Sequence, residues 1–226
     1  MAVQAQHRAQ AALRALLAAA ASAALLAGCA SGPAPPDWQT NAHNALGNFE
    51  TAYLRGDARV AQLEFARARQ ELSSTGRADL VAHAELVRCA LRVASLEFDN
   101  CPGFEPLAGD ASPAERAYAA YLSGRWHGLD AALLPAQHRA IIARGDGVLG
   151  AIVDPLSRLV AAGALFRAGR LSPRGIAIAL DTASANGWRR PLLAWLGVQE
   201  QRAEQAGDRA AAALIRRRIE LVAGEH

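Results

Sequence analysis

Residue types that commonly perform catalysis are scattered through this 226-residue sequence without the spacing that catalysis requires. It contains no HExxH, GxSxG or P-loop motif and no paired CxxC motif for a metal. Ser157 stands in DPLSRL, which is typical of a helix start rather than of the strained turn that carries a nucleophilic serine. Four histidines also lack ligand or triad spacing: His43, His83, His127 and His138. We therefore predict no catalytic residue, no metal site and no dissociable cofactor.

The most distinctive internal stretch is GWRRPLLAWL, residues 187–196. In one interpretation its glycine and proline mark a helix end and the next helix start, and Trp188 and Trp195 pack between helices. In the other, both tryptophans form an aromatic floor, and Arg189 and Arg190 face an acidic partner, a carboxylate or a lipid phosphate. We keep these four residues as candidate partner-binding residues.

The N-terminal segment has the pattern of a secretory signal. The first 28 residues contain no acidic side chain, and Arg8 and Arg14 make the start basic. The uncharged run that follows, from Ala15 to Gly28, has 14 residues, whereas a membrane-spanning helix needs about 20. A short apolar run after a basic start is typical of a signal peptide.

This run ends in Leu26, Ala27, Gly28 and Cys29, which resembles the lipobox of bacterial lipoproteins. The resemblance implies transfer of diacylglycerol to the Cys29 sulfur, cleavage after Gly28 and acylation of the new amino group. In the family's sorting rule, an aspartate after the cysteine retains the protein in the inner membrane. Ala30 stands there instead, which implies the periplasmic face of the outer membrane. The alternative is an ordinary secretory peptide with an incidental cysteine.

A short tether is predicted to join this anchor to the fold. Residues 29–36 are small or proline-rich and cannot form a helix. Because a proline-rich chain extends ~3.1 Å per residue, residues 30–36 reach about 20 Å. We expect residues 1–28 to be the signal peptide, 29–36 the tether, and 37–226 a folded domain close to the membrane.

Cys89 and Cys101 are a candidate disulfide. In an oxidising periplasm such a bond contributes about 3 kcal/mol by the chain-entropy estimate, and free thiols are the alternative. A helix that continued to Phe98 would rise about 13 Å beyond Cys89. Only a sharp reversal at 99–100 would then bring the two Cα atoms within about 7 Å.

Composition and charge favour an all-α protein without a nucleic-acid partner. All 24 basic residues are arginine, and two of them precede Cys29, which leaves 22 against 21 acidic residues. This balance is close to neutral and gives no general attraction for nucleic acid. Aromatic residues make up only 5% of the chain, and alanine and arginine, both good helix formers, are abundant.

Cap and turn signals divide the chain into helices. Ser112-Pro113-Ala114-Glu115 has the pattern of a capping box with proline at the first helical position. Proline and glycine residues near 99–112 mark a loop and a candidate domain sub-boundary. Proline and glycine residues also interrupt the helical pattern in 126–153, so no secondary structure is assigned there. The predicted helices cover residues 37–55, 58–73, 78–98, 113–123, 155–169, 173–187, 191–207 and 209–222.

The spacing of these helices indicates repeated hairpins. The starts at Pro155 and Pro191 are 36 residues apart, as are the caps at Ser172 and Asp208, and such a period is typical of an α-solenoid. A second observation is a motif within AYLRGDARVAQLEFARA. It consists of Gly56, Asp57, Ala61, Phe65 and Ala68.

This motif resembles the tetratricopeptide (TPR) pattern of Gly-Asp at the hairpin turn followed by small, aromatic and alanine positions. Small residues let antiparallel helices approach, and the aromatic fills the groove between them. A second stretch matches at Gly207, Asp208 and Ala212 but departs at Arg216. The resemblance covers two hairpins and implies a TPR-like solenoid of antiparallel hairpins; a non-repeating helical bundle is the alternative.

We therefore expect an outer-membrane lipoprotein that acts without catalysis as an interaction or assembly adaptor for envelope proteins. This function rests on analogy at the level of the fold. A competing hypothesis is an enzyme or binding protein for cell wall or lipid, with Glu97, Asp99 and Glu115 gathered in a pocket at the Cys101 loop. A third is a purely structural lipoprotein.

Overall fold

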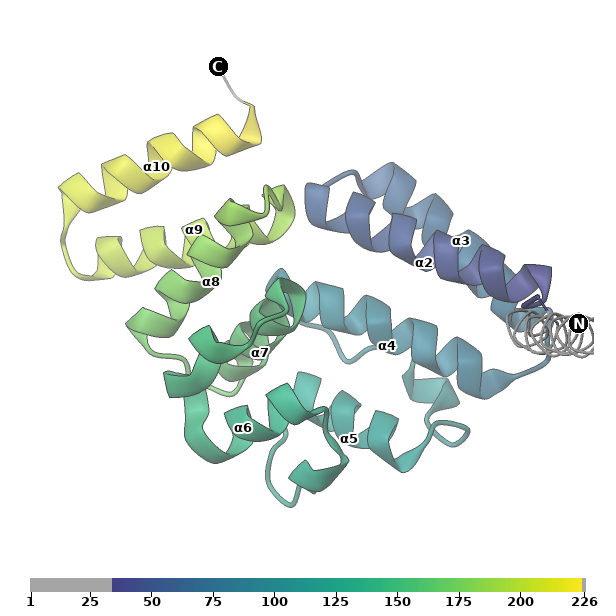
Figure 1. The fold of residues 1–226 in the computed structure, drawn as a ribbon. Helices are drawn as coiled ribbons and strands as arrows, with labels where there is room; N and C mark the ends of the chain where they lie inside the picture. The colour runs from purple at the N-terminus through teal and green to yellow at the C-terminus, as the bar shows by residue number, and fades with distance from the viewer. Residues whose placement is uncertain (1–33, 225–226) are drawn as a thin grey trace, which may run out of the picture. The chain divides into compact units, whose positions relative to one another are not determined.

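The computed structural model describes residues 34–224, and the regular structure in that range is entirely helical (Figure 1). The α-helices are α2 (Asp37–Arg55), α3 (Ala58–Ser73), α4 (Ala78–Ala94), α5 (Pro113–Leu122), α6 (Ala136–Arg144), α7 (Pro155–Arg167), α8 (Pro173–Ala185), α9 (Arg189–Gln205) and α10 (Arg209–Ala223). Three 3-10 segments join them, namely η2 (Glu105–Leu107), η3 (Ala131–Leu133) and η4 (Gly145–Ala151). The fold class predicted from the sequence, all-α, is confirmed.

The predicted signal peptide, the predicted lipid-attachment residue Cys29 and most of the predicted tether lie outside the described residues. Ala34–Pro36 are exposed and non-helical. A compact unit begins at Trp38 and is described below by itself. None of the helices described between residues 34 and 224 combines the length and the apolar character needed to cross a bilayer.

Side-chain caps begin most helices where the sequence predicts them. Ser112 accepts a hydrogen bond from the Glu115 N–H, and the Glu115 side chain returns a bond to the Ser112 N–H. Asp154 and Ser172, each before a proline, cap α7 and α8 by accepting the N–H groups of Ser157 and Gly175, without a returning bond. The capping oxygens satisfy backbone N–H groups that have no partner within the helix.

Helix α4 is shorter than predicted. It ends at Ala94 rather than Phe98, because Leu96 adopts a left-handed backbone conformation with φ of 59°. The Glu97 N–H then donates to the Arg92 carbonyl at 2.9 Å, which closes the helix as a Schellman-type cap. The sequence does not predict this helix end, because the left-handed position after a helix is usually a glycine and here it is Leu96. Helix α9, by contrast, starts earlier than predicted. It begins at Arg189, two residues before the expected start at Pro191.

Helix α4 lies between the α2–α3 hairpin and α5 (Figure 1), and it contributes to two hydrophobic clusters. One joins α4 to the α2–α3 hairpin through residues such as Phe49, Phe65 and Leu91. The larger joins α4 to α5, α7, α8 and α9, and it includes Cys101 and Phe104 of the connecting loop. One hydrophobic cluster therefore contains residues from both sides of loop 99–112.

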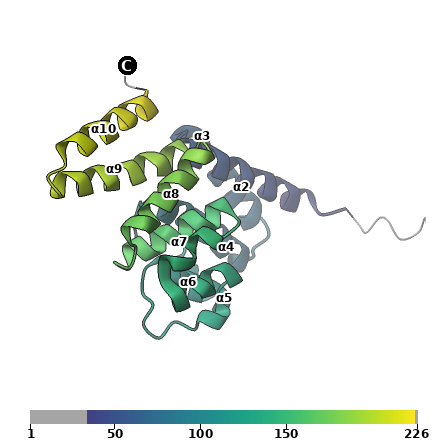
Figure 2. The same ribbon diagram turned by 60° about the vertical axis from the view of Figure 1, so that its left-hand side comes forward.

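Helices α7, α8, α9 and α10 pack against one another in chain order, and α9 and α10 form an antiparallel pair (Figure 2). Helix α4 departs from this order, because it packs against α7 across the intervening α5, η3, α6 and η4. This approach requires a small residue: a Cβ at Gly163 would overlap the carbonyl oxygen of Val93. A regular repeat along the whole chain stays a prediction.

Candidate partner-binding groove

A groove of about 580 Å³ opens between α2, α4, α5, α7 and the segment around α6; we call it the central groove. Its aliphatic lining includes Val87 of α4, Leu156 of α7 and Leu133 of η3, which are half-buried or exposed, above the buried Leu86, Leu91 and Val160. Helix α7 contacts α4, α5 and α6, and this packing brings the lining together. The groove therefore depends on helices distant in sequence.

The central groove continues into a second hollow of about 540 Å³ over α6 and η4. The two hollows share Gln137 and Asp154 in their linings. Leu133 and Val153 stand at the edges of this continuous surface, and Val153 is 91% exposed. Val153 and Leu133 therefore add exposed apolar side chains to the two hollows.

Two carboxylates, from Glu50 and Asp154, line the central groove. Glu50 of α2 is half-buried; its burial raises the pKa of its carboxyl above the ordinary value, and the nearby charge of Asp154 raises that pKa further. One oxygen of Asp154 accepts the Ser157 N–H at 2.6 Å as the cap of α7. Within residues 34–224, no hydrogen bond or ion pair engages the Glu50 carboxylate.

The groove floor contains a buried histidine. His138 is almost fully buried, and its Nδ1 lies 3.2 Å from the hydroxyl oxygen of Tyr121. Burial lowers the pKa of His138 to about 4, although Asp154 acts in the opposite direction. Burial likewise raises the pKa of Tyr118. His138 is therefore neutral near pH 7, where it packs and hydrogen-bonds.

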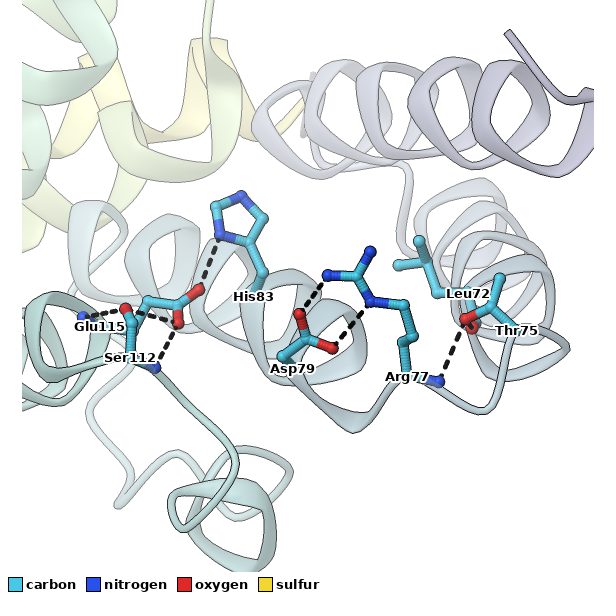
Figure 3. A network of polar contacts seen from close by, with 7 residues as sticks. All are labelled: Leu72, Thr75, Arg77, Asp79, His83, Ser112 and Glu115. Atoms are coloured by element: carbon cyan, nitrogen blue, oxygen red, sulfur yellow. Dashed lines mark hydrogen bonds and ion pairs between the residues drawn. The ribbon is translucent and has the colours of Figure 1, made fainter.

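A polar network lies at the groove rim (Figure 3). The Ser112 N–H and hydroxyl donate to one oxygen of Glu115 at 2.8 and 2.9 Å, and Nδ1 of His83 lies 3.2 Å from the other. Burial alone would raise the pKa of Glu115, but these bonds outweigh it and hold the pKa below its ordinary value. Arg77, just before α4, and Asp79 in its first turn form a separate ion pair at 2.6 Å. Glu115 thus fixes the start of α5 against α4.

The predicted partner-binding stretch is divided between core and surface. Trp195 is fully buried, its indole N–H donates to the Ala94 carbonyl at 3.2 Å, and its ring meets the Phe166 ring edge-on at 5.8 Å. The prediction that Trp195 contacts a partner was wrong, because its side chain has no exposed surface. Trp188 is half-buried and packs against both hydrophobic clusters.

Arg190 joins three elements, whereas Arg189 is exposed. The Arg190 Nε donates to the Tyr53 carbonyl at 2.9 Å, Nη1 donates to Glu97 at 2.8 Å, and the guanidinium stacks 4.4 Å from the centre of the Tyr53 ring. These bonds tie the start of α9 to the end of α2 and to the segment after α4. Arg190 is therefore engaged within the chain.

Cys89 and Cys101 are paired as a disulfide with their Cα atoms 5.6 Å apart. The early end of α4 makes this possible, since the chain reverses at Leu96 rather than at residues 99–100. Asp99 accepts the Cys101 N–H at 2.9 Å and lies close to both sulfur atoms. In the disulfide neither cysteine is a thiolate, the form that binds metals.

The three acidic residues expected at the Cys101 loop do not line one pocket, which corrects that prediction. Glu97 and Asp99 form ion pairs with Arg92 at 3.2 and 2.9 Å, whereas Glu115 lies at the central groove. A hollow of about 240 Å³ beside Cys101 is lined by none of the three. The arginines make Glu97 and Asp99 part of a structural network.

Reasoning from the sequence missed the pairing of Glu50 with Asp154. Asp154 was identified only as a helix cap, and Glu50 carried no local signal. The two positions are about 100 residues apart, and only the tertiary fold brings both into the lining of the central groove. No family model matches the chain, and no curated protein or solved structure does either.

Proposed function

We propose that this protein is a lipoprotein of the bacterial envelope, anchored through Cys29 to the periplasmic face of the outer membrane. Its helical body is a noncatalytic interaction module, and the central groove binds an apolar segment of another envelope protein. The observation that carries this proposal is the groove itself, an aliphatic channel of about 580 Å³ that continues into a further hollow of about 540 Å³.

The form of the groove supports a chain segment as its occupant. Compact ligand sites usually enclose most of a ligand within one cavity of about 300–1,000 Å³. Here two hollows meet at Gln137 and Asp154, and both are open to solvent along their length. Burial of this aliphatic surface by a partner would contribute roughly 25 cal/mol per Å² before the costs of association.

The anchor is tested by labelling with radioactive palmitate. We expect the wild-type chain to take up label and to fractionate with outer membranes, and Cys29→Ala to lose both properties. The Cys101→Ala chain is the matched control, since it also removes a cysteine but leaves the predicted lipid-attachment residue. Continued labelling of Cys29→Ala would overturn the proposed anchor.

Contact with a partner is tested by a photo-crosslinking amino acid introduced at Val153 in living cells. We expect one discrete crosslinked species, which mass spectrometry identifies, and no such species with the crosslinker at Ala210, exposed on α10. Ala114 is exposed at the rim, and Ala114→Trp should obstruct the groove and reduce the crosslink. Ala210→Trp should not.

Two outcomes would contradict this function. If Val153 and Ala210 gave the same diffuse products, a purely structural lipoprotein would account better for the protein. If Ala114→Trp left a discrete crosslink unchanged, the partner would bind elsewhere than the central groove.

A further inference from the structure

We infer that the central groove selects a partner segment in which one lysine or arginine stands among apolar residues, with its cation between Glu50 and Asp154. This inference rests on the proposed function and specifies the chemistry of the partner. It follows from the charge and burial of the groove, taken with the aliphatic side chains around the two carboxylates.

The first observation is the unfavourable placement of Glu50. Its side chain is half-buried, the like charge of Asp154 raises its pKa further, and within residues 34–224 no hydrogen-bond donor or ion-pair partner engages it. Moving a carboxylate partly out of water costs free energy unless an opposite charge or donors replace the water. A cation beside Glu50 would offset the like charge of Asp154 and replace part of the hydration that the buried carboxylate has lost.

The second observation is the sign of the other charges in the central groove. Its lining contains three carboxylates, from Glu50, Glu115 and Asp154, and no lysine or arginine. Among the lining residues, the side chain most like a cation is the imidazole of His83, and it is already bonded to Glu115. Arg144 lines the neighbouring hollow instead. The central groove is therefore complementary to positive charge.

The third observation is the aliphatic wall of the groove. Val87 of α4 and Leu156 of α7 are half-buried, and Leu133 of η3 is 39% exposed. A strongly hydrated small cation would leave this wall exposed to water. Lysine and arginine suit it better, because their methylene stems cover apolar surface while their charged ends reach polar groups. Apolar neighbours in the same segment would cover the remainder.

The experiment measures binding of three synthetic peptides by isothermal titration calorimetry. The peptides have two leucines on each side of a central position and differ only there, with lysine, glutamine or glutamate. The protein is the mature chain in nanodiscs of zwitterionic phosphatidylcholine, and empty nanodiscs provide the blank. We expect the lysine peptide to bind at least about tenfold more tightly than the glutamate peptide.

Two variants test the carboxylates. Glu50→Gln removes one charge, and Asp154→Asn removes the other while keeping a residue that caps helices equally well. Each should reduce the preference for lysine to about threefold or less, with little change for the glutamine peptide. The matched control Glu220→Gln removes an exposed charge on α10 and should keep the full preference.

The outcomes separate this inference from the proposed function. Equal affinity for all three peptides, or a preference unchanged in both variants, would overturn the selection for a cation. The same holds if no peptide binds, since all three carry the apolar flanks and one carries the cation. In each case a discrete crosslink from Val153 that Ala114→Trp abolishes would leave the proposed function standing.

Discussion

At the scale of single residues, burial decides what the polar side chains of this protein can do. His138 is inaccessible and held next to Tyr121, whereas Glu50 remains half open to the groove. Both have shifted pKa values, and in both the largest cause is loss of water. For His138 the consequence is a dependence of stability on pH.

We predict that His138 makes the protein less stable as the pH falls below 6.5. The pKa of His138 is about 4 in the folded chain, against 6.5 ordinarily, so below pH 6.5 the unfolded chain binds the proton more readily. The contribution is complete above pH 6.5 and is lost progressively toward pH 4. Chemical denaturation at pH 7 and 5 should show about 2 kcal/mol of this loss.

The variant His138→Phe should lack this part of the pH dependence. His43→Gln, a change at an exposed position of α2, should keep it. If His138→Phe and wild type lost the same free energy of unfolding between pH 7 and 5, another group would be responsible.

At the scale of elements, helix starts could be predicted from the sequence and helix contacts could not. Ser112, Asp154 and Ser172 act within three residues of their own positions, so a local pattern identifies them. The end of α4 was misplaced because Leu96 takes a backbone conformation that its residue type disfavours. The groove was not foreseen, because its lining depends on α4 meeting α7 over a long stretch of intervening chain.

The contact between α4 and α7 makes Gly163 sensitive to a single methyl group. We predict that Gly163→Ala lowers the free energy of unfolding by about 1–3 kcal/mol, because its Cβ would overlap the backbone of Val93. Gly47→Ala on α2 is the matched control, since nothing lies within 4 Å of its added Cβ. It should stabilise by about 0.5–1 kcal/mol. Urea denaturation measures both, and equal effects would contradict the close approach.

The disulfide fixes the segment after α4, which carries Glu97 and Asp99. We predict that Cys101→Ser costs about 3 kcal/mol of stability, because the bond closes a loop over 12 positions. Iodoacetamide should label neither Cys89 nor Cys101 of the native protein until a reductant is added, as mass spectrometry would detect. Labelling of both without reductant would show free thiols.

At the scale of the whole molecule, stability should be unevenly distributed. Helix α10 packs chiefly on α9, only Ala212 of it is fully buried, and Leu214 and Leu221 are 57% and 64% exposed. Helices α4 and α7, by contrast, lie in the larger hydrophobic cluster. Elements with few buried contacts open without unfolding the rest.

We therefore predict that the amides of α10 exchange with deuterium at least about tenfold faster than those of α4 and α7. Hydrogen exchange read by mass spectrometry on proteolytic fragments would measure this difference. Equal protection of all three helices would contradict the prediction and would mean that the molecule opens as one unit.

The bond from Arg190 to the Tyr53 carbonyl joins positions 137 residues apart, and this separation constrains the order of assembly. As the chain emerges from the ribosome, the α2–α3 hairpin is complete after about a third of synthesis. The Tyr53 carbonyl already accepts the Gly56 N–H at 3.0 Å within the hairpin turn, and Arg190, which adds a second bond, is synthesised only in the last quarter of the chain. The tie between the end of α2 and the start of α9 can therefore form only late in synthesis, after the first hairpin has been made.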